Sequence, residues 1–280
     1  MRNPYKRSDV YTCRHPGHAR FGNRVSAHHV LRVKKCHPHG CLVFKWSCEL
    51  KNKGKSCVRG FKHIGRLCYG CTHYHDEKIH YQPEVSISAV DYQAFMEEVE
   101  QFEDWLTGVE GRELSFWAQV SSVKPRFRVE KTSKGKQIRL EGYLAVLKRG
   151  YIGTVEFDDL FYAALSPRQQ GRIELAADDR FEARAKVQLD SGRVVMTRVH
   201  AIEHEFRSGR HIWNNSEALI ARATASHFPD QPEICQHCSQ GALVDVFERK
   251  EGRTVRSRAL YCLAGVADPG LCYVRALGGV

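Results

Sequence analysis

The stretch between Cys13 and His75 limits the possible folds of this chain more than any other feature. It holds seven of the eleven cysteines and nine histidines, with few apolar residues among them. Sulfur and imidazole donors at this density favour a metal ion as the centre of the local structure, because a segment with little apolar sequence cannot build a hydrophobic core. We therefore expect the first third of the chain to need metal for folding.

The cysteine spacing predicts two metal sites in this stretch. In the Cys68-x-x-Cys71 motif, the two intervening residues let both sulfur atoms reach one ion at about 2.3 Å. Cys36 and Cys41 bound a turn that contains proline and glycine, which is typical of a metal knuckle. One grouping assigns a four-thiolate site to Cys48, Cys57, Cys68 and Cys71. It leaves a second site for Cys13, Cys36, Cys41 and a histidine, His15 or His18.

Zinc suits these thiolates, and a [4Fe-4S] cluster at the N-terminal cysteines is the alternative. The spacings of eight and ten residues within the four-thiolate set differ from regular zinc-finger repeats, which keeps the cluster open. Most of the histidines are expected at the surface or near phosphates rather than on metal. An open site of His73, His75 and Asp76 that activates water is less favoured than closed structural coordination.

Positive charge is concentrated in the same region. The net charge is +11; residues 1–80 carry 17 Lys and Arg against 4 Asp and Glu, and residues 116–215 carry 18 against 12. A cationic surface attracts phosphate backbones through counterion release, so nucleic acid is the expected partner. The basic side chains expected to contact it in the first part of the chain are Lys34, Lys35, Lys45, Lys51, Lys53, Lys55, Arg59 and Lys62.

The sequence gives no indication of export, membrane insertion or catalysis. The N-terminus lacks the apolar stretch of a secretory signal, and the longest apolar runs are too short to span a bilayer. A reducing cytoplasm is therefore expected, where clustered cysteines bind metal more often than they form disulfides. Walker, dinucleotide-binding and nucleophile-elbow patterns are lacking, which favours a binding protein over an enzyme.

Residues 85–112 change character and predict an acidic amphipathic helix. Apolar residues recur at intervals of four, three and four, at Phe95, Val99, Phe102 and Leu106, and acidic residues mostly occupy the other face. Ser88 followed by Asp91 resembles a capping box, and Gly108 is a natural stop.

Residues 113–210 alternate as strands do. We expect strands at 116–120, 138–146 and 151–157, a helix at 158–172, and two strands at 181–189 and 194–204 joined by the turn Asp190-Ser191-Gly192. We also expect a turn at residues 148–150 and, near the N-terminus, strands at 27–33 and 41–46. Three strands, a helix and two strands are the element order of an OB-fold barrel, and this resemblance predicts architecture rather than function.

Cations next to an aromatic residue in this region are typical of single-strand binding, in which bases stack on aromatic rings while Lys and Arg follow the backbone. The expected contacts are Arg126, Phe127, Arg128, Lys134 and Lys136. The candidate stacking platforms are Trp117, Phe127, Tyr143 and Tyr151. Aromatic residues in strands are more often core than stacking surfaces.

Residues 211–280 begin with an expected helix at 216–226 and continue as a zinc-ribbon-like module. Cys235-x-x-Cys238, a hairpin and two further cysteines, Cys262 and Cys272, are similar to a ribbon whose metal clamps one end of the hairpin. The nine residues between Cys262 and Cys272 exceed the usual gap, so His237 is the alternative to the last ligand.

Together these observations predict an α+β protein, mainly β, with four parts: a Cys/His-rich module (1–84), an acidic helix (85–112), an OB-like five-stranded barrel (113–210) and a helix with a zinc-ribbon-like module (211–280). The leading hypothesis is a metal-stabilised protein that binds RNA or single-stranded DNA. Two alternatives remain: an iron–sulfur redox or nucleic-acid-processing enzyme, and an accessory subunit that holds protein partners through its barrel and ribbon.

Overall fold

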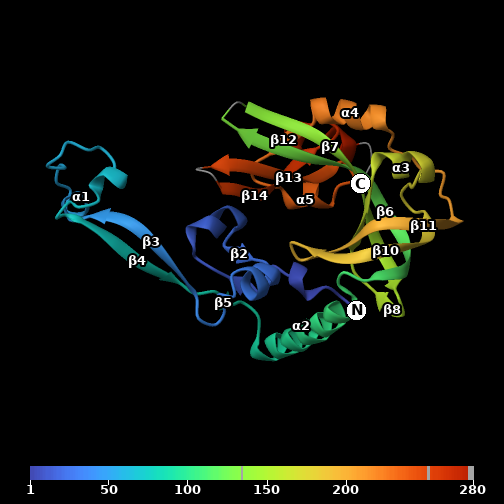
Figure 1. Cartoon of the computed structure of the whole chain (residues 1–280), viewed down its shortest axis with the longest axis horizontal. Coiled ribbons are helices and arrows are strands. Elements are labelled where there is room, and N and C mark those ends of the chain that lie inside the picture. Colours follow the sequence, from blue (N-terminus) through green and yellow to red (C-terminus); the bar gives the residue numbers. More distant parts are fainter. Residues whose placement is uncertain (134, 251–252, 277–280) are drawn as a thin grey trace. The chain divides into compact units, whose positions relative to one another are not determined.

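The computed structural model describes residues 1–133, 135–250 and 253–276. The protein is mixed α+β and mainly β, as the sequence predicts (Figure 1). It divides into two compact units, Tyr5–Phe95 and Met1–Pro4 with Met96–Val280. The predicted four-part division is finer than these units and stays a prediction. Within the described residues, no helix is long and apolar enough to cross a membrane.

The Tyr5–Phe95 unit consists of short elements. Its strands form a three-stranded sheet in the order β2-β1-β5 and a two-stranded ribbon of β3 and β4, which has α1 beyond its end (Figure 1). The elements are η1 (Pro4–Lys6), β1 (Tyr11–Thr12), η2 (Pro16–Phe21), β2 (Arg24–Val25), η3 (His29–Val33), β3 (Cys41–Cys48), α1 (Glu49–Asn52), η4 (Arg66–Cys68), β4 (Tyr74–Tyr81) and β5 (Glu84–Val85).

The expected strand at residues 27–33 is wrong, while the neighbouring strand that becomes β3 is confirmed. Residues 29–33 form the helical turn η3, because local backbone bonds close it. Val30 N–H donates to the Ser26 carbonyl at 3.2 Å, and Lys34 N–H donates to the His29 carbonyl at 2.8 Å. A short apolar run fits either a strand or a helical turn, and here local hydrogen bonding decides.

The acidic helix is confirmed as α2 (Ala89–Val109). The Ser88 hydroxyl accepts a hydrogen bond from the Asp91 N–H at 3.1 Å and donates to the Asp91 carboxylate at 2.7 Å. Ser88 therefore caps the helix as predicted, although the carboxylate bonds the Ser88 hydroxyl, whereas in a capping box it bonds the backbone N–H. The predicted apolar face is buried: Phe95, Val99, Phe102 and Leu106 are each 5% exposed or less. The periodicity therefore identified the core-facing side correctly.

The second unit contains the large sheet. Its strands are β6 (Glu113–Thr132), β7 (Gly135–Ile152), β8 (Val155–Phe157), β9 (Phe161–Leu165), β10 (Arg180–Asp190), β11 (Arg193–Phe206), β12 (Ser226–Phe228), β13 (Gly241–Lys250) and β14 (Arg253–Cys262). Its helices are α3 (Pro167–Ile173), α4 (Asn215–Thr224), α5 (Glu233–His237), η5 (Pro269–Leu271) and α6 (Tyr273–Ala276). All nine strands belong to one sheet, in the order β12-β14-β13-β6-β10-β11-β9-β7-β8.

Five of these strands pair in a closed cycle. β6 pairs with both β7 and β10, β10 pairs with β11, β11 pairs with β9, and β9 pairs with β7. Only the β11–β9 pairing within this cycle is parallel. Edge-to-face aromatic contacts fill the inside: the Phe116 ring centroid lies 5.6 Å from that of Phe181 and 6.4 Å from that of Phe161.

Two expectations for this unit fail. Residues 148–150 continue β7 rather than turning, and the interval expected to be helical from residue 158 contains strand β9 before α3 begins. Four of the five residues of β9 are buried, all but Ala164, and a short apolar run that is buried on both faces lacks the alternation that distinguishes a strand from a helix. The hairpin turn is confirmed, with positive φ at Ser191 and Gly192.

Candidate metal centres and nucleic-acid interface

The structure brings the four predicted C-terminal ligands around one small cavity. Cys235 on α5, Cys238 just after it, Cys262 at the end of β14 and Cys272 after η5 all line a space of about 20 Å³. A volume of this size holds about one water molecule, or a single ion. Cys238 and Cys262 are buried, and the other two are partly buried against an apolar cluster that includes Phe228.

The turn after Cys238 is shaped to present sulfur. The Gln240 N–H donates to the Cys238 Sγ at 3.4 Å, so the turn directs a backbone donor at this sulfur atom. A Cβ on Gly241 would lie 1.7 Å from the Cys235 carbonyl oxygen, so only glycine fits this turn. Lys124 donates to the carbonyls of Cys238 and Gly241, each at 2.7 Å, and burial lowers its pKa to about 8.

The second four-thiolate set lies at one end of the β3–β4 ribbon. Cys48 ends β3 and is the cross-strand partner of Tyr74, whose N–H donates to the Cys71 carbonyl at 3.0 Å. Cys57 and Cys68 belong to the connection between the strands, residues 49–73, which we call the ribbon tip. Three of the four predicted ligands are partly exposed and Cys48 is buried.

Cys57 has the local geometry of a thiolate ligand. Backbone N–H groups of Arg59 and Phe61 donate to its sulfur and hold its pKa below the usual value. The Gly60 N–H donates to the Cys57 carbonyl at 3.0 Å, and the φ of 74° at Gly60 closes this tight turn. The Cys68–Cys71 turn has the same form, with a positive φ at Gly70.

The ribbon tip has no hydrophobic core of its own. All residues from 49 to 82 are described, and each of them is at least partly exposed. A connection of this length with defined turns but without buried side chains lacks the usual source of folding free energy. A cross-link through its cysteines would supply it.

A third set comprises Cys13, Cys36 and Cys41. Burial raises the pKa of Cys36, and the neighbouring thiols of Cys41 and Cys13 raise it further, so the three sulfur atoms are close enough to interact. His37 follows Cys36 directly, and its Nδ1 is buried without a hydrogen-bond partner.

Three imidazoles gather in the same unit. The His18 ring centroid lies 5.4 Å from that of His15 and 5.1 Å from that of His29. Burial, and then nearby cations, lower the pKa of His18 and of His29, which favours the neutral form that binds metal. His18 was a predicted ligand, whereas nothing in the sequence distinguishes His29 from the other histidines.

These sets are defined by shared cavities, turns and charge contacts rather than by coordination geometry. Among residues 1–133, 135–250 and 253–276, no group of three or more His, Cys, Asp or Glu side chains is placed so that it could hold a metal ion. Coordination requires thiolates at about 2.3 Å from the ion, so the sulfur atoms would have to close in on binding. The side chain of His237 lies outside what the structure describes.

The predicted basic contacts of the first unit are almost all exposed. Lys51 is the exception, being partly buried, with its ammonium donating to the Lys62 carbonyl. Arg59 lies over the Phe61 ring at 5.1 Å. The ribbon tip carries six Lys and Arg against one acid, Glu49. The exposed predicted residues are Lys34, Lys35, Lys45, Lys53, Lys55, Arg59 and Lys62.

The ribbon also exposes apolar and aromatic side chains beside these cations. Leu42, Phe44 and Trp46 alternate along one face of β3 and are 60%, 58% and 39% exposed. Tyr69 of the tip is 55% exposed, and its ring centroid lies 5.8 Å from that of Trp46. Aromatic rings in water beside lysines form a surface suited to stacking.

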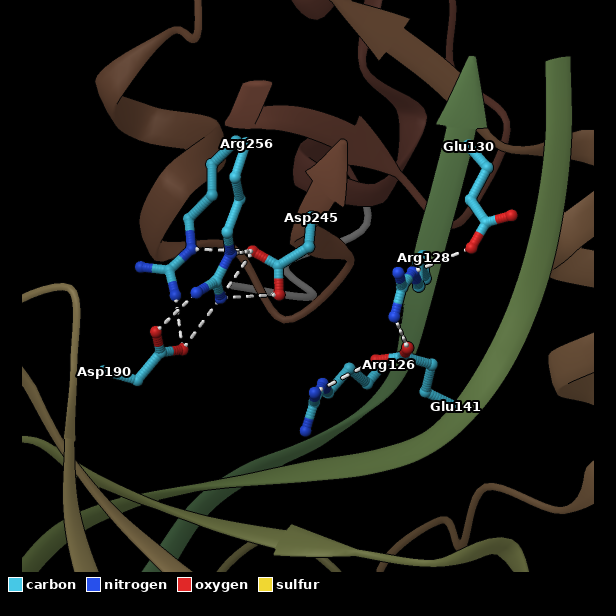
Figure 2. Close-up of polar contacts among 8 residues, drawn as sticks. Arg126, Arg128, Glu130, Glu141, Asp190, Asp245 and Arg256 are labelled. Atoms are coloured by element: carbon cyan, nitrogen blue, oxygen red, sulfur yellow. Dashed lines mark hydrogen bonds and ion pairs between the residues drawn. The ribbon is translucent and has the colours of Figure 1, made fainter. Parts of the chain in front are cut away.

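In the second unit, the predicted contacts Arg126 and Arg128 are held by carboxylates (Figure 2). Arg126 pairs with Glu141 at 3.0 Å, and Arg128 pairs with Glu130 at 3.1 Å and with Glu141 at 3.5 Å. These arginines are therefore less available to phosphate than the exposed lysines of the first unit. Lys136 is exposed, with its ammonium 5.2 Å from the Tyr261 ring centroid, and Lys134 lies outside the described residues.

An ion-pair network that the sequence does not predict lies beside these arginines. Asp190 at the β10–β11 turn pairs with Arg256 at 3.0 Å and Arg258 at 2.7 Å, and Asp245 pairs with the same two arginines at 3.0 and 3.1 Å (Figure 2). Asp190 of β10 is far along the chain from Asp245, Arg256 and Arg258 of the β13–β14 hairpin, so no local pattern reveals the network. Asp245 is 9% exposed, which makes this network part of the packed structure.

The structure separates the four predicted stacking platforms. Phe127 is 2% exposed and packs in a core cluster with Val129 and Val244, and Tyr143 is fully buried. Their rings therefore face the core, whereas stacking on a base requires an exposed ring. Trp117 and Tyr151 are cross-strand partners on the outer face, with Tyr151 42% exposed.

Comparisons of the chain with protein-family models, with curated proteins and with solved structures find no match.

Proposed function

We propose that this protein binds RNA or single-stranded DNA through a metal-stabilised ribbon. The observation that carries the proposal is the β3–β4 ribbon with its tip, which exposes Phe44, Trp46 and Tyr69 among lysines and arginines and has four cysteines but no core. Stacked bases and a cationic track for phosphates are the two requirements of single-strand recognition.

The metal we propose for the tip is zinc, held by Cys48, Cys57, Cys68 and Cys71. Thiolates aided by backbone N–H donors suit zinc, and a filled four-thiolate site adds folding free energy. In a reducing, cytoplasmic setting these thiols stay available as ligands. A [4Fe-4S] cluster is the alternative occupant; it would be recognised by iron, acid-labile sulfide and visible absorption in the purified protein.

We propose two further zinc sites on the same reasoning. Cys13, Cys36 and Cys41 would share one ion with a neutral imidazole, and His18 is the predicted fourth ligand. Cys235, Cys238, Cys262 and Cys272 would hold another in the small C-terminal cavity, as in a zinc ribbon. Metal analysis of the purified protein therefore distinguishes three bound zinc ions per chain from fewer.

We further propose that the closed cycle of β6, β7, β9, β11 and β10 is an OB-like barrel. In pairing order the cycle is β6, β7, β9, β11 and β10. Among these five strands, they are the first, second, third, fifth and fourth along the chain, and α3 connects β9 to β10. Closure of this kind removes exposed strand edges, and small barrels of this type bind oligonucleotides. In this proposal the barrel is the scaffold of the second unit.

The binding proposal is tested by fluorescence anisotropy with labelled single-stranded oligonucleotides of DNA and RNA across a salt series. Replacing Lys53 and Lys55 by Gln removes two backbone contacts, so the slope of log affinity against log salt should fall by about 1.4, at about 0.7 per contact. The matched control replaces two exposed arginines of the second unit, Arg172 and Arg222, by Gln and removes the same charge. Equal slopes for both variants would contradict a ribbon interface.

Absence of binding to every oligonucleotide, together with a protein that co-purifies in fixed ratio, would favour the accessory-subunit alternative. The exposed face of Leu42, Phe44 and Trp46 would then be the surface to test against that partner.

A further inference from the structure

A cleft lies on the outer face of the second unit, across β7, β6, β10 and β11. Its volume is about 380 Å³, within the range of about 300–1,000 Å³ of small-molecule sites. Trp117 and Tyr151 form one side, and Phe206 at the end of β11 lies on the other. These side chains alternate with core-facing neighbours such as the buried Phe116, so the strand pleat presents them to solvent.

The aromatic rings of this cleft are partly exposed to solvent, and contacts with neighbouring side chains fix their orientation. The Trp117 and Tyr151 ring centroids lie 6.3 Å apart with their planes at 56°, and Trp117 Nε1 donates to the Glu205 carboxylate at 2.5 Å. Phe206 is 45% exposed, and the Arg180 guanidinium lies over it at 5.1 Å. The cleft thus offers two separate stacking surfaces with fixed ring orientation.

The charges around the cleft favour an anionic ligand. Arg149 and Arg180 line it. Among the described residues, Arg149 pairs with Glu156 at 3.3 Å and Arg180 pairs with Glu205 at 3.7 Å, and exposed pairs of this kind are weak enough to be exchanged for phosphate. The one acid that lines it, Asp178, pairs with Lys148 at 2.9 Å, which holds its pKa below the usual value. The Gln119 amide can bond to the edge of a base.

We infer that this cleft is a stacking site for unpaired nucleotides, which takes one base on Trp117 and Tyr151 and the next on Phe206, with the phosphate between them on Arg149 or Arg180. The lining consists of three aromatic rings, two guanidiniums, an amide and the Asp178 carboxylate that Lys148 neutralises, without an aliphatic side chain, and it matches a base and phosphate better than an apolar peptide. The inference rests on the proposed function and extends it from the ribbon to the second unit. It makes single strands, rather than duplexes, the ligand.

The test compares two 15-nucleotide probes of equal charge, oligo(dT) and an abasic strand of the same length, bound to the full-length, metal-loaded protein. The wild type should prefer oligo(dT). The variant Trp117→Ala/Tyr151→Ala should lose about tenfold or more in affinity for oligo(dT), while its affinity for the abasic strand stays unchanged. Trp117→Phe/Tyr151→Phe should restore most of the preference, because it keeps the stacking rings. Leu219→Ala, which changes an exposed side chain on α4, is the control.

A second measurement does not depend on variants. Photo-cross-linking of a 5-iodouracil strand, followed by mass spectrometry, should place adducts on Trp117, Tyr151 or Phe206. Cross-links confined to the β3–β4 ribbon, with alanine variants that bind oligo(dT) like the wild type, would overturn the cleft while leaving the ribbon interface intact. Failure of the wild type to bind either probe, or RNA strands of the same length, would overturn both proposals.

Discussion

Two four-cysteine sets in this chain have opposite surroundings. The C-terminal set lies in a packed environment, where Cys262 shares a buried cluster with Phe228 and Leu260. The other set consists of Cys48 and three cysteines of the ribbon tip. Every residue of the tip, 49–73, is at least partly exposed. Four cysteines therefore lie beside a hydrophobic core at the C-terminal set, whereas the ribbon tip has four cysteines and no such core.

The difference indicates what metal would contribute in each place. Strands β13 and β14 pair along their whole described length and bury Val244 and Leu260, so burial and backbone bonds hold them without an ion. The ribbon tip has turns and a few backbone bonds, which together are too weak to order a long connection against its conformational entropy. Metal would be an addition to the C-terminal fold and a condition of the tip fold.

Removal of metal is the largest expected effect. A chelator strong enough to strip zinc should abolish amide protection in the ribbon tip, because an apparent binding free energy of about 10–16 kcal/mol disappears with the ion. Strands β13 and β14 should keep most of their protection. Hydrogen exchange followed by mass spectrometry measures both regions in one sample.

The control for this experiment is re-addition of zinc, which should restore protection at the tip. If β13 and β14 lose protection together with the tip, the two sets do not differ in the way proposed.

Single cysteine substitutions should give a smaller, local version of the same contrast. Cys57→Ser should lower the bound metal by one equivalent and disorder the tip, with Ser56→Ala as the neighbouring control. Cys262→Ser should also release one equivalent and cost about 1–3 kcal/mol for burying a hydroxyl, yet leave the hairpin folded. Metal analysis, combined with the free energy of unfolding of the second unit, checks the two variants. Retention of full metal content by Cys57→Ser would exclude Cys57 as a ligand.

The third prediction concerns the second unit alone. Asp245→Asn removes a charge that pairs with Arg256 and Arg258, and Arg258 has a side chain only 20% exposed. We expect a loss of about 2 kcal/mol in the free energy of unfolding, less than for a fully buried pair because Arg256 is 40% exposed. Chemical denaturation with and without chelator should give the same loss. Glu182→Gln, an exposed carboxylate on β10, is the matched control.

The sequence predicts best what depends on local periodicity. The spacing from Phe95 to Leu106 and the Ser88–Asp91 cap identify α2, and the turn at Asp190 identifies the β10–β11 hairpin. It fails at β9, where a run buried on both faces carries no alternation, and at residues 29–33, where local hydrogen bonds close a helical turn. These failures share one cause, namely that short apolar segments fit more than one backbone conformation.

The sequence predicts which residue types form the candidate sites, but not which of those residues lie together. Cysteine spacing identifies Cys235 and Cys238 as a pair, but only the fold brings Cys272 to the same cavity. Among the aromatic residues, the sequence could not separate the buried Phe127 from the exposed Tyr151, since both lie in strands of similar composition. No sequence pattern marks Phe206 as a site residue, because the cleft that it lines is formed by four strands.

The smallest expected effect separates the two regions by their response to acid. Burial raises the pKa of Asp190, but the hydrogen bond from Arg256 and the charge of Arg258 outweigh it, and the pKa in the folded state is lowered. A carboxyl with a lowered pKa stabilises the fold above its unfolded value of about 3.9 and loses this contribution as pH falls through the folded value. The second unit should therefore lose this stability only below about pH 4. Asp190→Asn should flatten that part of its stability–pH curve.

Thiolate ligands take up protons at milder acidity, so the tip should release its metal first as pH falls. An acid titration that follows bound zinc and the fluorescence of the second unit would show two separated transitions, whereas a single shared transition would mean that the tip and the second unit unfold together.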